Sequence, residues 1–269
     1  MKKRFKKIYI EITNKCSLAC SFCSKLNREL KTMNVLEFNH IINEVKGFTD
    51  YIYLHVKGEP LIHPELEEIL NIAYINSIAV NITSNGTNIK NMFDLFKRQK
   101  AIRQVNVSLH ALEVVNKKEE YLDNIIRLIE FVRETKKFYL SLRIWIDNKD
   151  VNEYIKSYLC DKLMIDDINE LGENIYWSYD KEFIWPNIND DFFCDKGSCL
   201  GTKTHIAILA NGDVVPCCLD GDGVIKLGNV FEESLESILN GSRFVSIHNG
   251  FNNNKLVEEL CQKCKYRRK

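Results

Sequence analysis

Strand-length apolar runs alternate with amphipathic segments of helix length along roughly the first two thirds of this chain. The apolar runs are residues 8–13, 51–56, 78–84, 104–110 and 138–146, with a weaker candidate at 175–179. Between them apolar residues recur at positions i, i+3, i+4 and i+7; one such set is Phe38, Ile41, Ile42 and Val45. This alternation predicts an α/β fold in which crossover helices join the parallel strands of one sheet.

One face of several predicted strands is polar toward its C-terminal end. Alternate residues of a strand point to opposite faces, and the polar residues that share faces are Glu11 and Thr13, Asn81 and Thr83, Asn106, Ser108 and His110, and Ser141 and Arg143. A closed eight-stranded barrel is filled by branched apolar side chains, and burying many polar groups without water is costly. We therefore expect an open, partial (β/α)6 TIM-like barrel whose interior holds a polar ligand. The alternative is that these residues face solvent at the strand ends.

Length and charge limit the class of protein. The 269 residues, 45% of them apolar, suffice for one large domain or for one domain with a small appendage. Lys plus Arg and Asp plus Glu number 37 each, and we find no apolar run of membrane-spanning length and no signal peptide. We therefore expect a cytoplasmic protein with no membrane partner, and we do not expect nucleic acid as a partner. The basic ends are interpreted as solvated tails, with contact to an anionic ligand as the alternative.

The cysteine content is unusual. The chain has 10 cysteines, which in a reducing compartment indicate metal binding or catalysis rather than disulfides. Cys16, Cys20 and Cys23 form a CxxxCxxC triplet directly after the first predicted strand, with no fourth cysteine near them in the sequence. Three thiolates on a [4Fe–4S] cluster leave one iron open to an external ligand, whereas a structural zinc site is closed by four protein ligands. The triplet therefore favours an iron–sulfur cluster.

This triplet, with the aromatic Phe22 before its last cysteine, resembles the signature of the radical S-adenosylmethionine (SAM) superfamily. The resemblance covers about residues 8–179. It implies that the open iron chelates SAM, that electron transfer cleaves SAM to a 5′-deoxyadenosyl radical, and that Phe22 belongs to the cofactor site. It also implies a reducing partner such as flavodoxin or ferredoxin.

Other segments are similar to further motifs of that family. Residues 57–60 read Lys-Gly-Glu-Pro where the family has GGEP, which implies that Gly58 and Glu59 receive the methionyl ammonium of SAM. Lys57 replaces the first glycine, and a simple turn after the second strand is the alternative. Residues 83–86 are similar to the family's TNG turn, and Ser108 stands where a family serine contacts the SAM ribose.

Two residues of the polar strand face have open roles. Arg143 is assigned to the cofactor-binding set as a partner of the SAM carboxylate, with an anionic substrate or a structural salt bridge as alternatives. His110 could reach SAM or substrate, although a single histidine at a strand end is more often structural.

The character of the sequence changes after about residue 185, which places the predicted domains at residues 1–185 and 186–269. Gly, Asp, Asn and Cys become frequent, and Asn211-Gly212 between two short apolar runs predicts a hairpin turn. Short helices are expected near residues 231–239 and 255–260. We expect this part to be a small cysteine-rich domain attached to the barrel.

The C-terminal part carries a second set of cysteines: Cys199, Cys217, Cys261 and Cys264. Either Zn²⁺ or a [4Fe–4S] cluster fits four thiolates. The spacing CX₁₂GX₄C followed by CX₂C is similar to the start of the SPASM extension of radical SAM enzymes, in the shortened "twitch" form. That resemblance implies an auxiliary [4Fe–4S] cluster that transfers electrons. Cys218 could substitute for Cys217, and Cys160 and Cys194 are left without a role.

Three functions are compatible with these patterns. The resemblance implies hydrogen abstraction followed by electron exit through the auxiliary cluster, which is a two-electron oxidation of a small hydroxyl compound; a family member with a twitch domain is a dehydrogenase of this kind. The alternative is maturation of a ribosomal peptide by thioether formation or epimerisation, against which the early first strand weighs. A non-catalytic iron–sulfur electron carrier is the third hypothesis. The catalytic residues stay unidentified, with Asp191 and Asp195 as guesses for a base.

Overall fold

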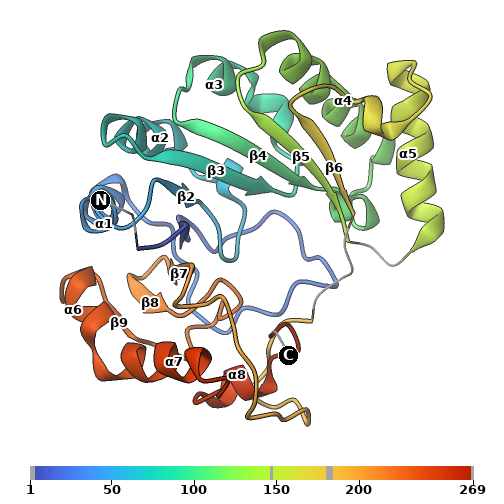
Figure 1. Ribbon diagram of the computed structural model, residues 1–269. Coiled ribbons are helices and arrows are strands. Elements are labelled where there is room, and N and C mark those ends of the chain that lie inside the picture. The colour runs from blue at the N-terminus through green and yellow to red at the C-terminus, as the bar shows by residue number, and fades with distance from the viewer. Residues whose placement is uncertain (1–3, 146–147, 180–183, 268–269) are drawn as a thin grey trace.

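The computed structural model describes residues 4–145, 148–179 and 184–267. Its strands form one curved sheet in the order β6-β5-β4-β3-β2-β1-β7-β8-β9 (Figure 1). The strands are β1 (Lys7–Ile10), β2 (Tyr51–Tyr53), β3 (Ala79–Ser84), β4 (Ile102–Ser108), β5 (Tyr139–Ile144), β6 (Ile175–Tyr179), β7 (His205–Ile208), β8 (Asp213–Val215) and β9 (Gly228–Asn229).

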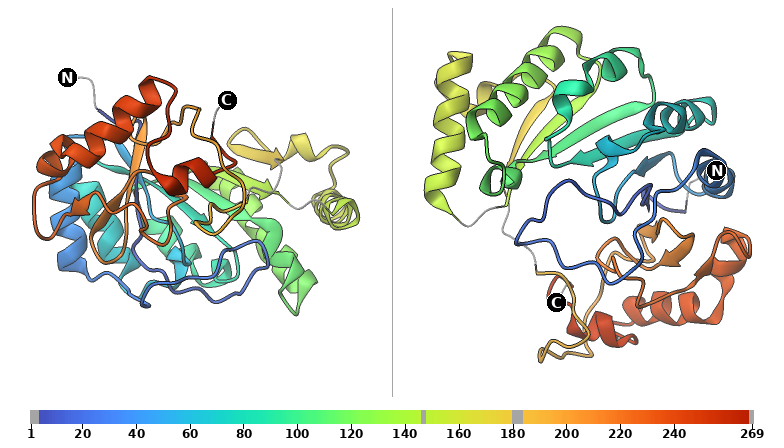
Figure 2. Two further views of the ribbon diagram at one scale, coloured as in Figure 1. Left: turned by 90° about the horizontal axis from the view of Figure 1, so that it is seen from below. Right: turned by 180° about the vertical axis from the view of Figure 1, so that it is seen from behind.

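Strands β1 to β6 are parallel neighbours in sequence order. Their connections contain the helices α1 (Val35–Val45), α2 (Leu66–Ile75), α3 (Phe93–Arg98), α4 (Lys118–Thr135) and α5 (Lys149–Leu163). These helices cover the outer side of the sheet, and the inner side faces the C-terminal part of the chain (Figures 1 and 2). The predicted partial barrel, including its weaker sixth strand, is confirmed.

Helix α1 shows how the local sequence sets these elements. Its N-cap residue Asn34 accepts a hydrogen bond from the backbone of Glu37, whose side chain accepts one from the backbone of Asn34. This reciprocal capping box satisfies two donors of the first turn. The predicted apolar set is the buried face of the helix, and Phe38 of that set is fully buried.

Alternation along β1 separates the core from the interior of the barrel. Ile8 and Ile10 are fully buried in the hydrophobic core under the helices. Lys7 and Tyr9 point to the opposite side, where both line a cavity. The apolar and polar faces of the strands therefore lie as the sequence predicts.

Strand β1 is shorter than predicted, because the chain leaves the sheet after Ile10. Thr13 forms an isolated antiparallel bridge with Thr32. Glu11, predicted to face the barrel interior, is fully buried and accepts bonds from Arg28 Nη2 at 2.8 and 2.9 Å, from the Lys57 amide at 3.1 Å and from the Ala210 amide at 3.0 Å. The Glu11 carboxylate therefore binds groups of the protein itself and not a ligand in the barrel interior.

The C-terminal part continues the sheet of the barrel. Strand β7 pairs in parallel with β1, and β8 pairs antiparallel with β7 through the predicted Asn211-Gly212 turn. Gly212 has a φ of +87°, and a Cβ there would lie 2.4 Å from the ring of Phe231. The expected hairpin is confirmed, and it extends the barrel sheet beyond β1.

The C-terminal helices are α6 (Leu235–Asn240), α7 (Ser242–Asn252) and α8 (Glu259–Lys263). The predictions near 231–239 and 255–260 correspond to α6 and α8 with shifted ends, whereas α7 was not predicted. Ser, His, Asn and Gly in α7 are poor helix formers. Burial of Phe244, Ile247 and Phe251 stabilises this helix, and such tertiary packing has no local sequence signal.

We expect Glu11→Gln to lower the thermal unfolding midpoint much more than Glu67→Gln does. The Glu11 and Arg28 side chains are 0% and 12% exposed, and breaking a buried ion pair costs about 3–5 kcal/mol. Glu67 pairs with Arg98 at side-chain exposures of 40% and 57%, where such a pair contributes about 0–1 kcal/mol. Circular dichroism under anaerobic conditions measures both midpoints, and equal shifts would contradict the prediction.

Candidate active site

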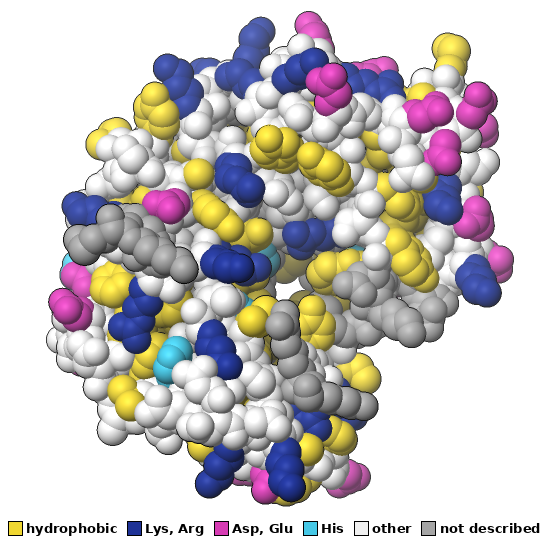
Figure 3. Space-filling model, in the orientation of Figure 1, with side chains coloured by type: hydrophobic (Ala, Val, Ile, Leu, Met, Phe, Trp, Pro, Cys, Tyr) yellow, Lys and Arg dark blue, Asp and Glu magenta, His cyan; other side chains and the backbone are white. Residues whose placement is uncertain are grey.

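A cavity of about 1270 Å³ lies between the inner face of the sheet and the C-terminal part. Its walls come from strands β1, β2, β3, β4, β5 and β7, from the loop after β1, and from the segments around Cys199 and Cys217. The space-filling view shows the molecule hollowed between its two halves, with Lys, Arg and hydrophobic side chains around the hollow (Figure 3). The interior cavity expected from the polar strand faces is therefore present.

The first cysteine set opens onto this cavity. Cys16, Cys20 and Cys23 lie on the loop after β1, and all three line the cavity wall. The Leu18 amide and the Asn85 side-chain amide donate to Cys16 Sγ at 3.5 and 3.6 Å. Burial raises the pKa of Cys20 to about 11, so this thiol needs a metal cation to become a thiolate at neutral pH.

The turn that resembles GGEP lies beside this loop. Gly58 has a φ of +78°, and a Cβ there would lie 2.2 Å from the carbonyl oxygen of Thr13, so only glycine fits. Glu59 is buried and accepts bonds from the Leu61 amide at 3.0 Å and the Asn85 amide at 2.6 Å. Burial raises its pKa, while these two bonds and one from the Ser84 side chain oppose that shift. Because a carboxylate has about four acceptor positions, Glu59 keeps capacity for another donor from the cavity.

Lys57, which replaces the first family glycine, connects the two halves of the protein. Its Nζ donates to the Ser24 carbonyl at 3.0 Å and also contacts the Ser24 hydroxyl. The same ammonium lies 3.5 Å from the centroid of the Trp185 ring, close to the start of the C-terminal part. Burial lowers its pKa, and the neighbouring Cys23 opposes that shift. Lys57 thus holds the cysteine loop in place through its side chain, at a position where the family has a glycine.

Phe22 and Ser108 line the cavity, as expected for cofactor-binding residues. The Phe22 ring lies 4.7 Å from the ring of His110, measured between centroids. His110 is buried and accepts a bond from the Trp145 amide at 3.0 Å through Nε2. Burial lowers its pKa to about 4, so His110 is neutral at physiological pH. A structural role in holding Phe22 accounts for these contacts.

Arg143 lies opposite Ser108 in the sheet register and also lines the cavity. Its guanidinium donates to the side chain of Asn106 at 2.7 Å. Burial lowers its pKa, and the nearby hydroxyls of Tyr53 and Tyr9 oppose that shift. Arg143 therefore belongs with a group of aromatic and basic residues that the sequence analysis did not single out.

That group consists of Lys7, Tyr9, Tyr51, Tyr53, His55 and His205, all lining the cavity. Lys7 and Tyr9 come from β1, and His205 comes from β7. Tyr51 and Tyr53 come from β2, and His55 follows that strand. The sequence feature that could have predicted this group is the i, i+2 spacing of Lys7 with Tyr9 and of Tyr51 with Tyr53 and His55. This spacing puts each set on one face of its strand.

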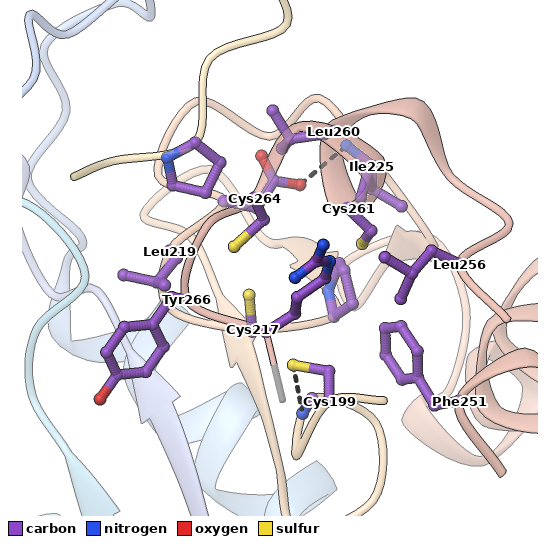
Figure 4. Close-up of a pocket in the computed structure, with 15 residues that line it drawn as sticks. Cys199, Cys217, Leu219, Ile225, Phe251, Leu256, Leu260, Cys261, Cys264 and Tyr266 are labelled. Atoms are coloured by element: carbon purple, nitrogen blue, oxygen red, sulfur yellow. Dashed lines mark hydrogen bonds between the residues drawn. The ribbon is translucent and has the colours of Figure 1, made fainter. Parts of the chain in front are cut away.

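The second cysteine set surrounds a pocket of about 40 Å³ lined largely by apolar side chains. The sulfurs of Cys199, Cys217, Cys261 and Cys264 gather around this pocket (Figure 4). The Gly201 amide donates to Cys199 Sγ at 3.4 Å. In the part of the chain that the structure describes, no three His, Cys, Asp or Glu side chains are grouped to hold a single metal ion. The four thiols thus line a pocket, and Cys199 and Cys217 also face the large cavity.

Cys217 and Cys218, adjacent in sequence, face different surroundings. Burial raises the pKa of Cys217 well above the usual thiol value, and the other cysteines of its set reinforce the shift. Cys218 lines only the large cavity, beside the Tyr9 hydroxyl and near the Lys7 ammonium. This arrangement favours Cys217 as the fourth ligand of the second set. Asp191 and Asp195, the guessed bases, are exposed and do not line the cavity.

Comparison with known protein families agrees with this geometry. Residues 10–157 match the radical SAM superfamily, and residues 199–265 match the SPASM family, described as an iron–sulfur cluster-binding domain. The first match spans more than half of the 269 residues. The chain therefore belongs to the radical SAM superfamily and carries a SPASM domain. The cofactors of this class, SAM and iron–sulfur clusters, are those expected from the two cysteine sets.

Individual proteins similar to this chain share a short matched segment or a low sequence identity with it. A SAM-dependent nucleotide dehydratase of Selenomonas ruminantium is 31% identical over 83 residues, which is 30% of each chain. BtrN, solved with AdoMet and 2-DOIA, has a TM-score of 0.63 at 18% identity, covering 98% of this chain and 94% of its own. Streptococcus suis SuiB, solved with the precursor peptide SuiA, has a TM-score of 0.55 at 18% identity, covering 97% of this chain and 71% of its own. These structural likenesses show a shared fold.

The donor sets fit the cofactors of this class. The three-thiol loop leaves room for an external ligand from the cavity, and the second pocket offers four protein thiols, enough to complete a cluster. Within the described ranges, no helix combines the length and the apolar character that crossing a membrane requires.

We predict that Cys217→Ala loses one cluster's share of iron and sulfide, whereas Cys218→Ala keeps the full content. The reason is that only Cys217 lines the pocket of the second cysteine set. Iron and sulfide analysis after anaerobic reconstitution measures the difference. Equal losses in the two variants, or a loss confined to Cys218→Ala, would show that the ligand is assigned wrongly.

Proposed function

We propose that this protein cleaves SAM reductively and uses the 5′-deoxyadenosyl radical to abstract a hydrogen atom in a two-electron oxidation of a small hydroxyl compound. The observation that carries this proposal is one cavity shared by both cysteine sets. Cys16, Cys20 and Cys23 line it from one side, and Cys199 and Cys217 line it from the C-terminal part. A substrate in this cavity lies between a site for radical generation and a site for electron exit.

The electrons and atoms balance for such a step. Hydrogen abstraction from a carbinol carbon gives 5′-deoxyadenosine and a substrate radical. A cluster held by Cys199, Cys217, Cys261 and Cys264 would accept the one electron that leaves as the carbonyl product forms, and the hydroxyl proton would go to a base. The protein's own contribution is to hold SAM and substrate together and to exclude water. A cytoplasmic setting with a reducing partner such as flavodoxin or ferredoxin belongs to the same proposal.

The SAM pocket in this proposal consists of Phe22, Gly58, Glu59 and Ser108. All four line the cavity together with the three-cysteine loop. Gly58 permits the close approach of the turn to Thr13, and Glu59 has acceptor capacity for the methionyl ammonium. Phe22 is held against His110, which fixes an aromatic surface beside the cysteines.

Peptide modification is the second candidate. SuiB, whose fold this chain shares, was solved with its precursor peptide SuiA. A cavity of about 1270 Å³ also admits a peptide side chain with part of its backbone. Under this alternative the modified residue enters the same space between the two cysteine sets.

Three cysteine variants test the proposal. With dithionite and SAM, wild type, Cys261→Ala and Cys160→Ala should form 5′-deoxyadenosine, whereas Cys16→Ala should form none. Cys160 on α5 lies outside both cysteine sets and is the matched control. Liquid chromatography with mass spectrometry measures the product, and 5′-deoxyadenosine formation by Cys16→Ala would refute the role of the triplet.

The electron-exit role requires a second measurement. With secondary alcohols deuterated at the carbinol carbon, deuterium should enter 5′-deoxyadenosine in wild type and in Cys261→Ala. The carbonyl product should form only in wild type and in Cys160→Ala. Normal carbonyl formation by Cys261→Ala would show that the second set does not accept the electron. Deuterium transfer from a peptide but from no alcohol would favour peptide modification.

A further inference from the structure

Two cations on the inner face of the sheet have no carboxylate partner among the described residues. The Lys7 ammonium lies 5.1 Å from the ring centroid of Tyr9 and 4.9 Å from that of Tyr53. The Arg143 guanidinium contacts the neutral side chain of Asn106. Over residues 4–145, 148–179 and 184–267, no ion pair joins Lys7 or Arg143 to an Asp or Glu. Half-buried cations without a counter-ion are costly unless a ligand supplies one.

The excess of positive charge is a property of the cavity and not of the whole chain. The chain is neutral overall, with 37 basic and 37 acidic residues. The described cavity wall contains five cations, Lys6, Lys7, Lys25, Lys57 and Arg143, and a single carboxylate, that of Glu59. Lys57 is engaged with Ser24, and Glu59 is engaged with two backbone amides. Lys7 and Arg143 are therefore the half-buried cations of the wall that are left without a charged or backbone partner.

These two cations lie close together. Burial lowers the pKa of Lys7, the nearby Cys218 thiol opposes that shift, and the positive charge of Arg143 adds to the lowering. Both cations also lie near the Tyr53 ring: the Lys7 ammonium is over it, and its hydroxyl opposes the pKa shift of Arg143. An anion between them would relieve the repulsion of the two like charges.

Lys7 lies apart from the SAM pocket, whereas Arg143 pairs with Ser108 of that pocket in the sheet register. Arg143 reaches Asn106, which precedes Ser108 by two residues and so lies nearer the N-terminal end of β4. Lys7 is the first residue of β1, whereas the three-cysteine loop follows the other end of that strand. Lys7 instead lies near Cys218, in the C-terminal part. A group held here would leave the rest of the substrate directed toward the first cysteine set.

Aromatic surface surrounds the two cations. The rings of Tyr9 and Tyr53 lie 5.0 Å apart between centroids, and that of His55 lies 5.4 Å from Tyr9. Burial lowers the pKa of His55 to about 3 and that of His205 to about 4, so both imidazoles are neutral at physiological pH. Neutral rings offer apolar surface to a carbon skeleton without competing for an anion.

We propose that Lys7 and Arg143 bind an oxyanion of the substrate, a phosphate or a carboxylate, while Tyr9 and Tyr53 contact its carbon skeleton. This inference rests on the proposed function, because it assigns the substrate class of the same cavity. The hydroxyl compound is then an anionic one, held at its charged end near the auxiliary site and presenting its reacting carbon to SAM.

Isothermal titration of the reconstituted, SAM-loaded protein with inorganic pyrophosphate tests this inference. We expect Lys7→Met and Arg143→Met to weaken pyrophosphate binding about tenfold or more, since each removes one charge that faces the anion. Lys7→Arg and Arg143→Lys keep the charge and should recover most of the affinity. Lys156→Met, which removes an exposed cation of α5 paired with Glu153, is the matched control and should bind as wild type does.

Two further probes identify the oxyanion. At constant ionic strength, tighter binding of pyrophosphate and phosphate than of succinate assigns a phosphorylated substrate, and the reverse order assigns a carboxylate. The inference would be overturned if the wild-type protein bound pyrophosphate, phosphate and succinate no more tightly than chloride. It would also be overturned if both Met variants bound pyrophosphate as tightly as the wild type. So would an Arg143→Met variant that loses SAM binding and keeps pyrophosphate binding.

Failure of this inference is distinguishable from failure of the proposed function. SAM cleavage by the wild-type protein is measured on the same preparations. A protein that cleaves SAM but binds no oxyanion overturns the inference alone, whereas one that binds pyrophosphate but does not cleave SAM overturns the proposed function.

Discussion

The buried carboxylate of Glu11 is the contact on which the arrangement of the site depends. It stands at the point where the chain leaves β1, and its two oxygens accept bonds from Arg28, from the Lys57 amide and from the Ala210 amide. These partners belong to the loop that follows the cysteine triplet, to the turn that resembles GGEP, and to the segment after β7. One side chain thus fixes three walls of the cavity relative to the first strand. Arg28 adds a bond to the Gly221 carbonyl at 2.8 Å, which attaches the same loop to the C-terminal part.

The continuous sheet has a chemical consequence. Because β7 pairs directly with β1, the second cysteine set is attached rigidly to the strand that carries the first. Members of the two sets therefore face one cavity, from segments that follow two directly paired strands. A substrate bound in this cavity must keep a constant position relative to the metal site for electron transfer. The same constant position orients the substrate toward the charged groups of the cavity wall.

The charge of the cavity depends on where the charged side chains lie and not on the net charge of the chain. A chain with no net charge encloses a cavity with an excess of cations, because its carboxylates lie mostly on the outer surface or, as with Glu11, are paired inside the protein. Lys57 shows the same principle near the cysteine triplet, where an ammonium occupies the place of a family glycine and contacts Ser24 and Trp185. The loop around the first cluster site is thereby held by side chains that are particular to this sequence.

The sequence by itself determined the partial barrel, both cysteine sets and most of the residues near the first set. These features are local: hydrophobic periods fix strands and helices, and ligand spacing fixes a metal loop. The SAM-binding roles of Phe22, Gly58, Glu59, Ser108 and Arg143 stay predictions, although all five line the cavity. Helix α7 escaped prediction because its stability comes from the burial of residues such as Phe244, which propensity does not reveal.

Only the tertiary structure decided how the distant segments meet. The pairing of β7 with β1 joins residues about 200 positions apart, and no period or motif in either segment encodes that partner. The same pairing brings Ala210 to Glu11, which does not line the cavity. Other long-range contacts decided that Cys217 and not Cys218 lines the auxiliary pocket and that Lys7 lies near Arg143. The physical reason is that the free energy of such contacts depends on burial and on geometry between distant segments, which are defined only after the chain has folded.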